Sequence, residues 1–102
     1  MKIEYVNIEE LKPSEYNPRT LSDKQHEDIK KSLERFGFVD PVIVNKHKDR
    51  HNIIVGGHQR VKVAKDLGHD TVPVYYVELS KTKEKELNIR LNKNTGDWNF
   101  DI

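Results

Sequence analysis

The sequence predicts a small α/β domain, a mixed β-sheet with helices packed on it. Four short segments are rich in β-branched and aromatic residues, and three longer segments carry helical patterning and capping residues. The length of 102 residues fits a single domain. Because only 34% of the residues are hydrophobic and an equal 34% are charged, we expect a small core.

The first half of the chain begins with an apolar and polar alternation over residues 2–8, which predicts a strand. Two prolines within residues 11–19 then predict an irregular loop, because proline disfavours helix at the residue before it. Ser22 followed by Gln25 is a capping-box pattern, and the helix that it opens ends at Gly37. We expect this helix to bury one stripe, made of Ile29, Leu33 and Phe36.

The second half is predicted to form a hairpin, a helix, a strand and a final polar helix. These elements are a strand over 41–44, a strand over 52–55, a helix over 58–67, a strand over 71–77 and a helix from 80 to about 94. Arg50 is expected at the solvated tip of the hairpin, and Pro73 suggests an edge strand or the start of a strand. Glu84 lies among alternating lysines and glutamates, a pattern typical of a solvated helix face.

Composition excludes several classes of protein. The chain has no cysteine, which excludes disulfides, thiolate zinc sites and thiol nucleophiles. No apolar run approaches the roughly 20 residues of a membrane helix, so we expect a cytoplasmic protein with no membrane partner. Eighteen Lys and Arg against seventeen Asp and Glu give a net charge of +1, which argues against gripping nucleic acid by bulk charge alone.

The sharpest motif is a predicted strand, a glycine pair and a predicted helix. Its residues are Gly56, Gly57, His58, Gln59 and Arg60. A helix start presents unpaired backbone N–H groups and partial positive charge, and glycines allow an anion to approach, so the motif predicts a phosphate or carboxylate site. Residues 46–69 add six Lys or Arg against two Asp, a local charge of +4. The alternative is a tight strand-to-helix turn with Arg60 as an ordinary surface residue.

Three parts of the chain resemble the ParB/sulfiredoxin superfamily. They are the loop Leu11 to Arg19, the corner Phe36 to Pro41 and the segment Ile54 to Arg60. The similarity extends from Ile8 to about Phe100 and is greatest to ParB N-terminal-like domains of phage and mobile elements, which are often attached to DNA methyltransferases. The closing stretch Leu91 to Trp98 fits the methyltransferase-associated branch. The resemblance implies the ParB/sulfiredoxin fold.

The resemblance also implies a nucleotide site, with CTP or ATP/ADP and Mg²⁺ as ligands. The phosphates would lie at the Gly56 to Arg60 turn, where Asn17 and Arg19 would close over them. Asn92 corresponds to a secondary position in the CTP-dependent members. DNA is the partner that the resemblance implies for the full-length protein, together with a methyltransferase or another C-terminal domain.

Members of this superfamily have different activities, and individual residues separate them. The sulfinic acid reductases carry a cysteine where this chain has His58, so that activity is excluded. The CTP-hydrolysing clamps carry a carboxylate at the His58 position and an arginine at the Gln59 position. Nucleotide binding is therefore better supported than hydrolysis.

A nuclease, nucleotide hydrolase or kinase is the rival prediction, and it needs a carboxylate. Asp40 and Glu15 are the candidates, and their alternative roles are a turn cap and a solvated side chain. His58 could act as a general base or hold a phosphate, or it could instead bond the neighbouring loop. The histidines have no spacing that fixes three or four ligands together, so no metal site is predicted.

We expect one ParB-like domain over residues 1–95 and a polar and aromatic tail over 96–102 that leads into a C-terminal region. A third hypothesis is a non-catalytic specificity module that positions a DNA methyltransferase. The favoured prediction is a nucleotide- or DNA-interacting module of a larger phage or mobile-element protein for DNA modification or segregation.

Overall fold

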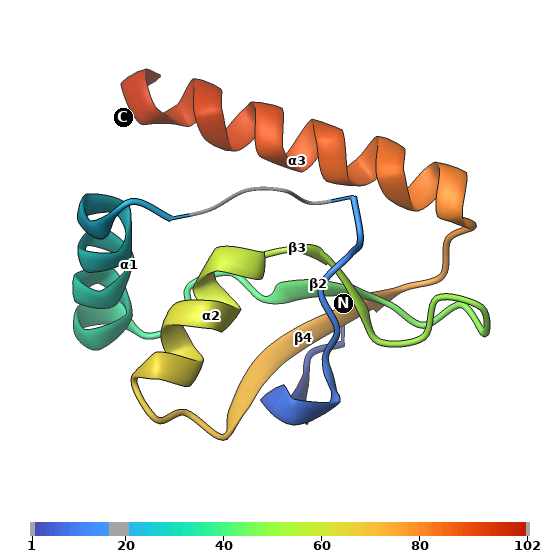
Figure 1. Cartoon of the computed structure of the whole chain (residues 1–102), viewed down its shortest axis with the longest axis horizontal. Coiled ribbons are helices and arrows are strands. Elements are labelled where there is room, and N and C mark those ends of the chain that lie inside the picture. The colour runs from blue at the N-terminus through green and yellow to red at the C-terminus, as the bar shows by residue number, and fades with distance from the viewer. Residues whose placement is uncertain (1, 17–20, 102) are drawn as a thin grey trace.

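The chain folds into one four-stranded mixed sheet with three helices, as predicted (Figure 1). The computed structural model describes the backbone of residues 2–16 and 21–101 and the side chains of these residues up to 91. The strands are β1 (Glu4–Asn7), β2 (Val42–Asn45), β3 (Ile53–Gly56) and β4 (Thr71–Val77), and the helices are α1 (Asp23–Phe36), α2 (His58–Asp66) and α3 (Lys81–Asp101). The strand order is β1-β4-β2-β3, in which β2 and β4 are parallel and the other pairs are antiparallel.

Helix α1 begins at the predicted capping box. The Ser22 side chain accepts from the Gln25 backbone N–H at 3.1 Å, and the Gln25 side chain accepts from the Ser22 backbone N–H at 3.0 Å. Leu33 is buried, as the helical stripe predicted, but Phe36 is 63% exposed. The prediction for Phe36 was wrong because α1 ends at that residue, where Gly37 turns the chain away at φ +70°.

The core lies between one face of the sheet and helices α1 and α2. Every second residue of the strands points to this face, and α2 covers it with an apolar stripe. The buried members are Ile8, Leu33, Val42, Val44, Ile54, Val61, Val63, Ala64, Val72 and Val74. All buried apolar residues of the described chain except Val55 thus belong to this one cluster, to which α2 contributes Val61, Val63 and Ala64.

Strand β4 lies inside the sheet, so the edge-strand interpretation of Pro73 was wrong. Pro73 pairs with Tyr5 of β1, whereas pairing with β2 begins one residue later, at Val74 opposite Val42. A proline lacks the N–H that a ladder needs, and it is accommodated here just before the parallel pairing starts.

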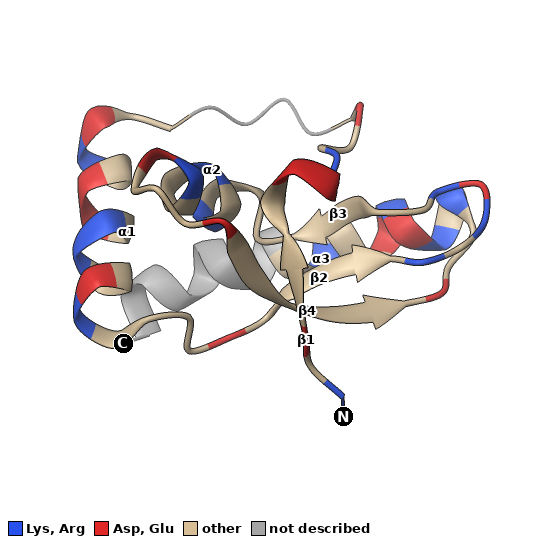
Figure 2. Cartoon of the chain, turned by 90° about the horizontal axis from the view of Figure 1, so that it is seen from below, with Lys and Arg blue, Asp and Glu red and all other residues tan. Residues whose placement is uncertain are grey.

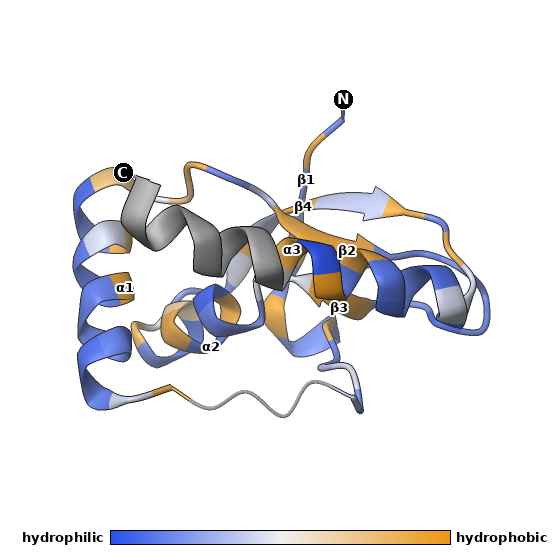
Figure 3. Ribbon diagram, turned by 90° about the horizontal axis from the view of Figure 1, so that it is seen from above, coloured by the Kyte–Doolittle hydropathy of each residue, from blue (hydrophilic) through white to orange (hydrophobic). Residues whose placement is uncertain are grey.

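Helix α3 packs on the opposite side of the sheet from the core. Figure 3 shows it lying across the strands when seen from above, and in Figure 2, from below, it lies behind them. The Asn88 side chain donates to the Val55 carbonyl of β3 at 2.8 Å. The helix that we expected to end near residue 94 continues to Asp101, so residues 96–101 of the expected tail are helical. Within the described chain, no helix has the length and apolar character needed to cross a membrane.

Candidate functional site

The turn between β3 and α2 is the place where the sequence predicts an anion site. Gly57 precedes the helix in the left-handed region at φ +98° and ψ 16°, and no side chain among the described residues caps the helix start. A side chain at Gly57 would be strained at this φ, and its Cβ would lie 3.0 Å from Arg60 Nη2. The first N–H groups of α2 therefore have no side-chain acceptor among the described residues, and an anion could accept from them.

Gly56 serves the packing of α3. A Cβ at this position would lie only 2.7 Å from Leu91 Cδ1. The absence of a side chain at Gly56 thus lets α3 approach the end of β3. This role differs from the approach of an anion that the glycine pair predicted.

Arg60 is directed to the corner between α1 and β2. Its Nη1 donates to the Asp40 carbonyl at 2.6 Å and its Nη2 donates to the Pro41 carbonyl at 3.3 Å. The guanidinium also lies 5.9 Å from the Phe38 ring centroid. Burial lowers the pKa of Arg60, and the nearby Asp40 opposes that shift. Arg60 therefore links the first turn of α2 to the segment before β2, and its guanidinium donates to backbone carbonyls.

His58, the first residue of α2, contacts the loop that follows β1. Its Nε2 lies 3.1 Å from the Ser14 hydroxyl and accepts from the Ser14 backbone N–H at 3.3 Å. Burial lowers the pKa of His58 to about 4, against a weaker opposing effect of Glu84. The imidazole is therefore neutral at pH 7, and the acceptor at Nε2 assigns its proton to Nδ1. The loop contact is the alternative role that the sequence left open for His58.

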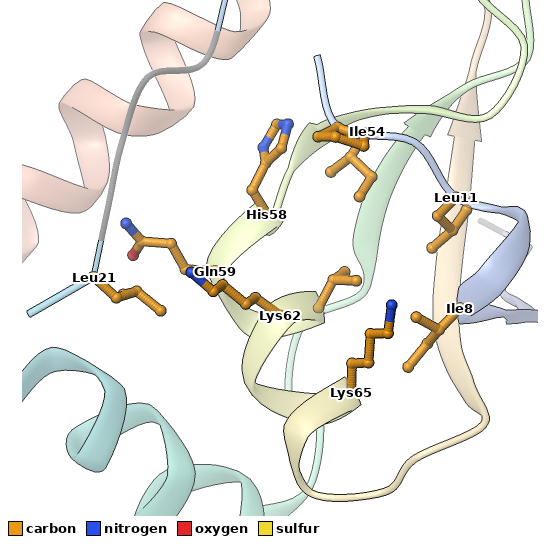
Figure 4. A pocket seen from close by; sticks show the side chains of 10 residues that line it. Ile8, Leu11, Leu21, Ile54, His58, Gln59, Lys62 and Lys65 are labelled. Carbon is orange, nitrogen blue, oxygen red and sulfur yellow. The ribbon is translucent and has the colours of Figure 1, made fainter. Parts of the chain in front are cut away.

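A pocket of about 320 Å³ lies beside α2 (Figure 4). One wall is apolar, with Leu11 and Pro13 from the loop and Ile54 from β3. Lys62 and Lys65 of α2 line it together with His58 and Gln59. An apolar hollow beside two ammonium groups and a helix start suits an organic anion that carries a planar or apolar part.

A buried ionic network joins the same loop to α3. Glu84 has no exposed surface, and its carboxylate accepts from Arg50 Nε at 3.1 Å and Nη2 at 2.8 Å. Tyr16 donates its hydroxyl to Glu84 at 2.6 Å, and Asn45 donates Nδ2 at 2.9 Å. Burial opposes ionisation of Glu84, but the donors from Arg50, Tyr16 and Asn45 outweigh it and lower its pKa. Glu84 is thus a charged group fixed inside the protein.

The comparison with protein families decides what kind of domain this is. The family model described as ParB N-terminal domain matches residues 1–95. The chain belongs to the ParB N-terminal domain family. "ParB-like nuclease domain-containing protein YnaK" of Escherichia coli is 34% identical over 84% of the chain and 94% of YnaK. Stage 0 sporulation protein J of Bacillus subtilis is 33% identical over 93% of the chain and 34% of that relative.

Solved structures show the same ParB/sulfiredoxin fold. Caulobacter crescentus ParB complexed with CTP-γ-S is 28% identical to this ParB N-terminal domain, with a TM-score of 0.79, over 90% of this chain and 53% of that one. Sulfiredoxin from Arabidopsis thaliana, 16% identical, has a TM-score of 0.70 over 85% of this chain and 97% of that one, a likeness of fold alone. The chain therefore spans about half of the crystallised ParB and a third of the sporulation protein.

The remaining predicted residues of this ParB N-terminal domain have separate positions. Glu15 forms a two-point ion pair with Arg50, at 3.0 Å and 2.7 Å, and this pairing lowers its pKa to about 2. Such a carboxylate is a weak base at neutral pH, so the geometry does not favour Glu15 as a catalytic base. Asp40 is exposed and offers its backbone carbonyl to Arg60. Asn17, Arg19 and the Asn92 side chain lie outside the described residues.

Two predictions for charged residues were wrong. Glu84 was expected on a solvated face and is buried, and Arg50 was expected at a solvated hairpin tip, whereas its side chain is 11% exposed. The helical spacing held a signal for Glu84, because it shares a face with Leu87, Asn88 and Leu91.

Lys62 and Lys65 were also missed, although they follow Gln59 at steps of three residues along α2. Among the described side chains, no three of His, Cys, Asp and Glu gather as metal ligands.

The lowered pKa of His58 predicts an acid-sensitive fold. Its folded pKa of about 4 lies below the ordinary 6.5, so the unfolded chain binds a proton first and stability falls as the pH drops from 6.5 toward 4. Denaturation in urea at pH 7.5 and pH 5 should show a loss of at most about 2 kcal/mol from this group. His58→Gln should flatten this part of the profile, whereas His51→Gln, at an exposed histidine, should leave it unchanged. An identical slope in His58→Gln would contradict the assignment.

Proposed function

We propose that this ParB N-terminal domain binds a nucleoside triphosphate of the CTP type, with the phosphates at the start of α2. The observation that carries the proposal is the left-handed, uncapped Gly57 start of α2 beside a pocket lined by Lys62 and Lys65. Backbone N–H groups and lysine ammonium groups together neutralise phosphate charge. The CTP-γ-S complex of a relative that is 28% identical supports CTP as the first ligand to test.

Within the proposal, the parts of the site have different tasks. The N–H groups at Gly57, His58 and Gln59 donate to phosphate oxygens, and the apolar wall at Leu11 and Pro13 contacts the base or ribose. Lys62 supplies positive charge, Lys65 adds to it from an exposed ion pair with Glu9, and Arg60 keeps the turn in place. Mg²⁺ would enter with the nucleotide, held by phosphate oxygens and water, since the described residues offer it no ligand cluster.

The proposal extends to the setting in which the domain works. Caulobacter ParB is also solved in complex with the centromeric parS site, and it matches this chain at 29% identity and a TM-score of 0.71 over 87% of this chain and 46% of that one. We propose that the domain belongs to a DNA-segregation or DNA-modification protein, of phage or mobile-element type, in which a methyltransferase is one candidate partner.

A nuclease is the second candidate, because the relative YnaK carries that word in its name. It would need a carboxylate, and Glu15 and Glu84 are both occupied by Arg50. Asp40, the other sequence-predicted acid, forms no ion pair with a residue of the described part of the chain. Magnesium-dependent nicking of plasmid DNA that disappears in Asp40→Ala would establish this activity.

Isothermal calorimetry with CTP and Mg²⁺ tests the proposed ligand. Lys62→Met should weaken binding by about 10- to 100-fold, the worth of a charged hydrogen bond of about 1.5–3 kcal/mol. The matched control is Lys31→Met on the exposed side of α1, which should bind like the wild type. No heat of binding from the wild type at millimolar CTP would contradict the proposal.

A further inference from the structure

Ser14 and His58 connect the loop that follows β1 to the first turn of α2, where the proposed site lies. Ser14 is 4% exposed, and both its hydroxyl and its backbone N–H lie within hydrogen-bond distance of His58 Nε2. The backbone N–H of Ser14 donates to this ring nitrogen and the hydroxyl lies beside it, so two polar groups of one residue converge on His58. Such convergence specifies the position of residue 14 relative to the first turn of α2.

The loop around Ser14 is fastened on both sides. Before it, Lys12 donates its N–H to the Asn52 carbonyl at 2.9 Å and accepts from the Ile54 N–H at 2.8 Å, which ties the loop to β3. After it, Tyr16 donates to the buried Glu84 of α3 at 2.6 Å. The contact between Ser14 and His58 fixes the stretch between these two anchors against α2.

This stretch is also a wall of the pocket. Leu11 and Pro13, which precede Ser14, line the hollow that Lys62 and Lys65 face from α2. Figure 4 shows the His58 ring at the start of α2 and the Lys65 side chain near its other end, beside Ile8. The imidazole and the lysines thus lie at different parts of the pocket. His58 therefore contacts the loop, while Lys62 lines the pocket as an exposed cation and Lys65 is ion-paired with Glu9 at 3.7 Å.

We infer that Ser14 and His58 are positioning residues, whose hydrogen bonds hold the Leu11 to Tyr16 loop as a ready-made wall of the nucleotide pocket. This inference rests on the proposed function and assigns His58 a role through Ser14 in place of a direct phosphate contact. A wall that is ordered before binding removes the cost of ordering it during binding. The gain in affinity is then the same for every ligand that fills the pocket, whatever its number of phosphates.

The test compares CMP, CDP and CTP by calorimetry in five proteins. These are the wild type, Ser14→Ala, His58→Ala, the double variant and Lys62→Met. We expect His58→Ala and the double variant to weaken all three nucleotides by a similar factor of about ten, since both remove the whole contact. Ser14→Ala should weaken them by a smaller common factor, because it removes the hydroxyl and leaves the backbone N–H bond to His58. Lys62→Met, by contrast, should cost more for CTP than for CMP, because it removes a charge that meets phosphate.

His58→Gln provides the conservative variant in case alanine unfolds the protein. Its side-chain carbonyl can accept from Ser14 near the position of Nε2, so we expect affinity within about threefold of the wild type. A thermal melt of each variant checks that the protein is folded at the temperature of the titration. The inference is overturned if the loss in His58→Ala grows from CMP to CTP. It is also overturned if the two single losses multiply in the double variant.

A ligand-free measurement separates this inference from the proposed function. In a long-range ¹⁵N spectrum at pH 7, His58 should show an unprotonated Nε2 and a protonated Nδ1, and Ser14→Ala should shift the Nε2 signal. A wild type that shows this signature but binds none of the three nucleotides would overturn the proposed function and the affinity role together. A protonated Nε2 would overturn the acceptor role of His58 toward the Ser14 backbone N–H, whatever the protein binds.

Discussion

Replacing Arg50 with Met is expected to lower the free energy of unfolding by about 3–5 kcal/mol, because the change leaves the buried Glu84 carboxylate without its cation. Arg50 donates to both Glu84 and Glu15, and the hydrogen bonds to these carboxylates raise its pKa. Denaturation in urea at pH 7 measures the loss. Lys48→Met, at an exposed position of the same hairpin, is the matched control and should stay within about 0.5 kcal/mol of the wild type.

A double replacement separates the lost charge from the lost packing. If the uncompensated Glu84 causes the loss, Arg50→Met combined with Glu84→Leu should recover part of the stability that Arg50→Met removes. Tyr16 and Asn45 would still lack their acceptor, so recovery should be incomplete. Additive losses in the double variant would contradict a buried ion pair at this position.

Replacing Arg60 with Ala is expected to lower the free energy of unfolding by about 2–3 kcal/mol. The change removes two charge-assisted hydrogen bonds to the carbonyls of Asp40 and Pro41 and the stacking on Phe38. Arg60→Lys should restore only part of the loss, because an ammonium group lacks the planar fork that spans two acceptors. Chemical denaturation followed by circular dichroism gives both values.

The control for Arg60 is Arg35→Ala, at an arginine that lies over the exposed ring of Phe36. Its loss should stay below about 1 kcal/mol, since a cation over an exposed ring contributes little. The opposite outcome for Arg60 is equally informative. An Arg60→Ala protein with unchanged stability and much weaker CTP binding would make Arg60 a phosphate ligand and not a clamp.

Local patterns predicted the elements well because their causes are local. The capping box at Ser22 and the glycine pair before α2 act within a few residues, and both lie where the sequence indicated. The turn at Gly37 and the exposure of Phe36 depend on where α1 ends relative to β2. That relation is tertiary, and a helical stripe alone does not contain it.

The parts of the site that sequence reasoning missed depend on long-range contacts. In the network at Glu84, Arg50 lies 34 positions and Tyr16 lies 68 positions from Glu84 in the sequence. In sequence, Glu84 and Arg50 each sit among lysines and look like solvated charges. Only the fold brings them together, and it also removes Arg50 and Arg60 from the positive charge counted over residues 46–69. The charge that remains at the pocket comes from Lys62 and Lys65.

An amide NMR titration of the wild type with CTP and Mg²⁺ tests the nucleotide site most directly. The proposed site predicts that the largest shift changes fall on Gly57, Gln59 and Lys62 and on the loop at Leu11 and Ser14, with saturation at one nucleotide per chain. Amides of the exposed surface of α1 should stay in place. Shift changes confined to α1, or none at millimolar CTP, would contradict a nucleotide site at the start of α2.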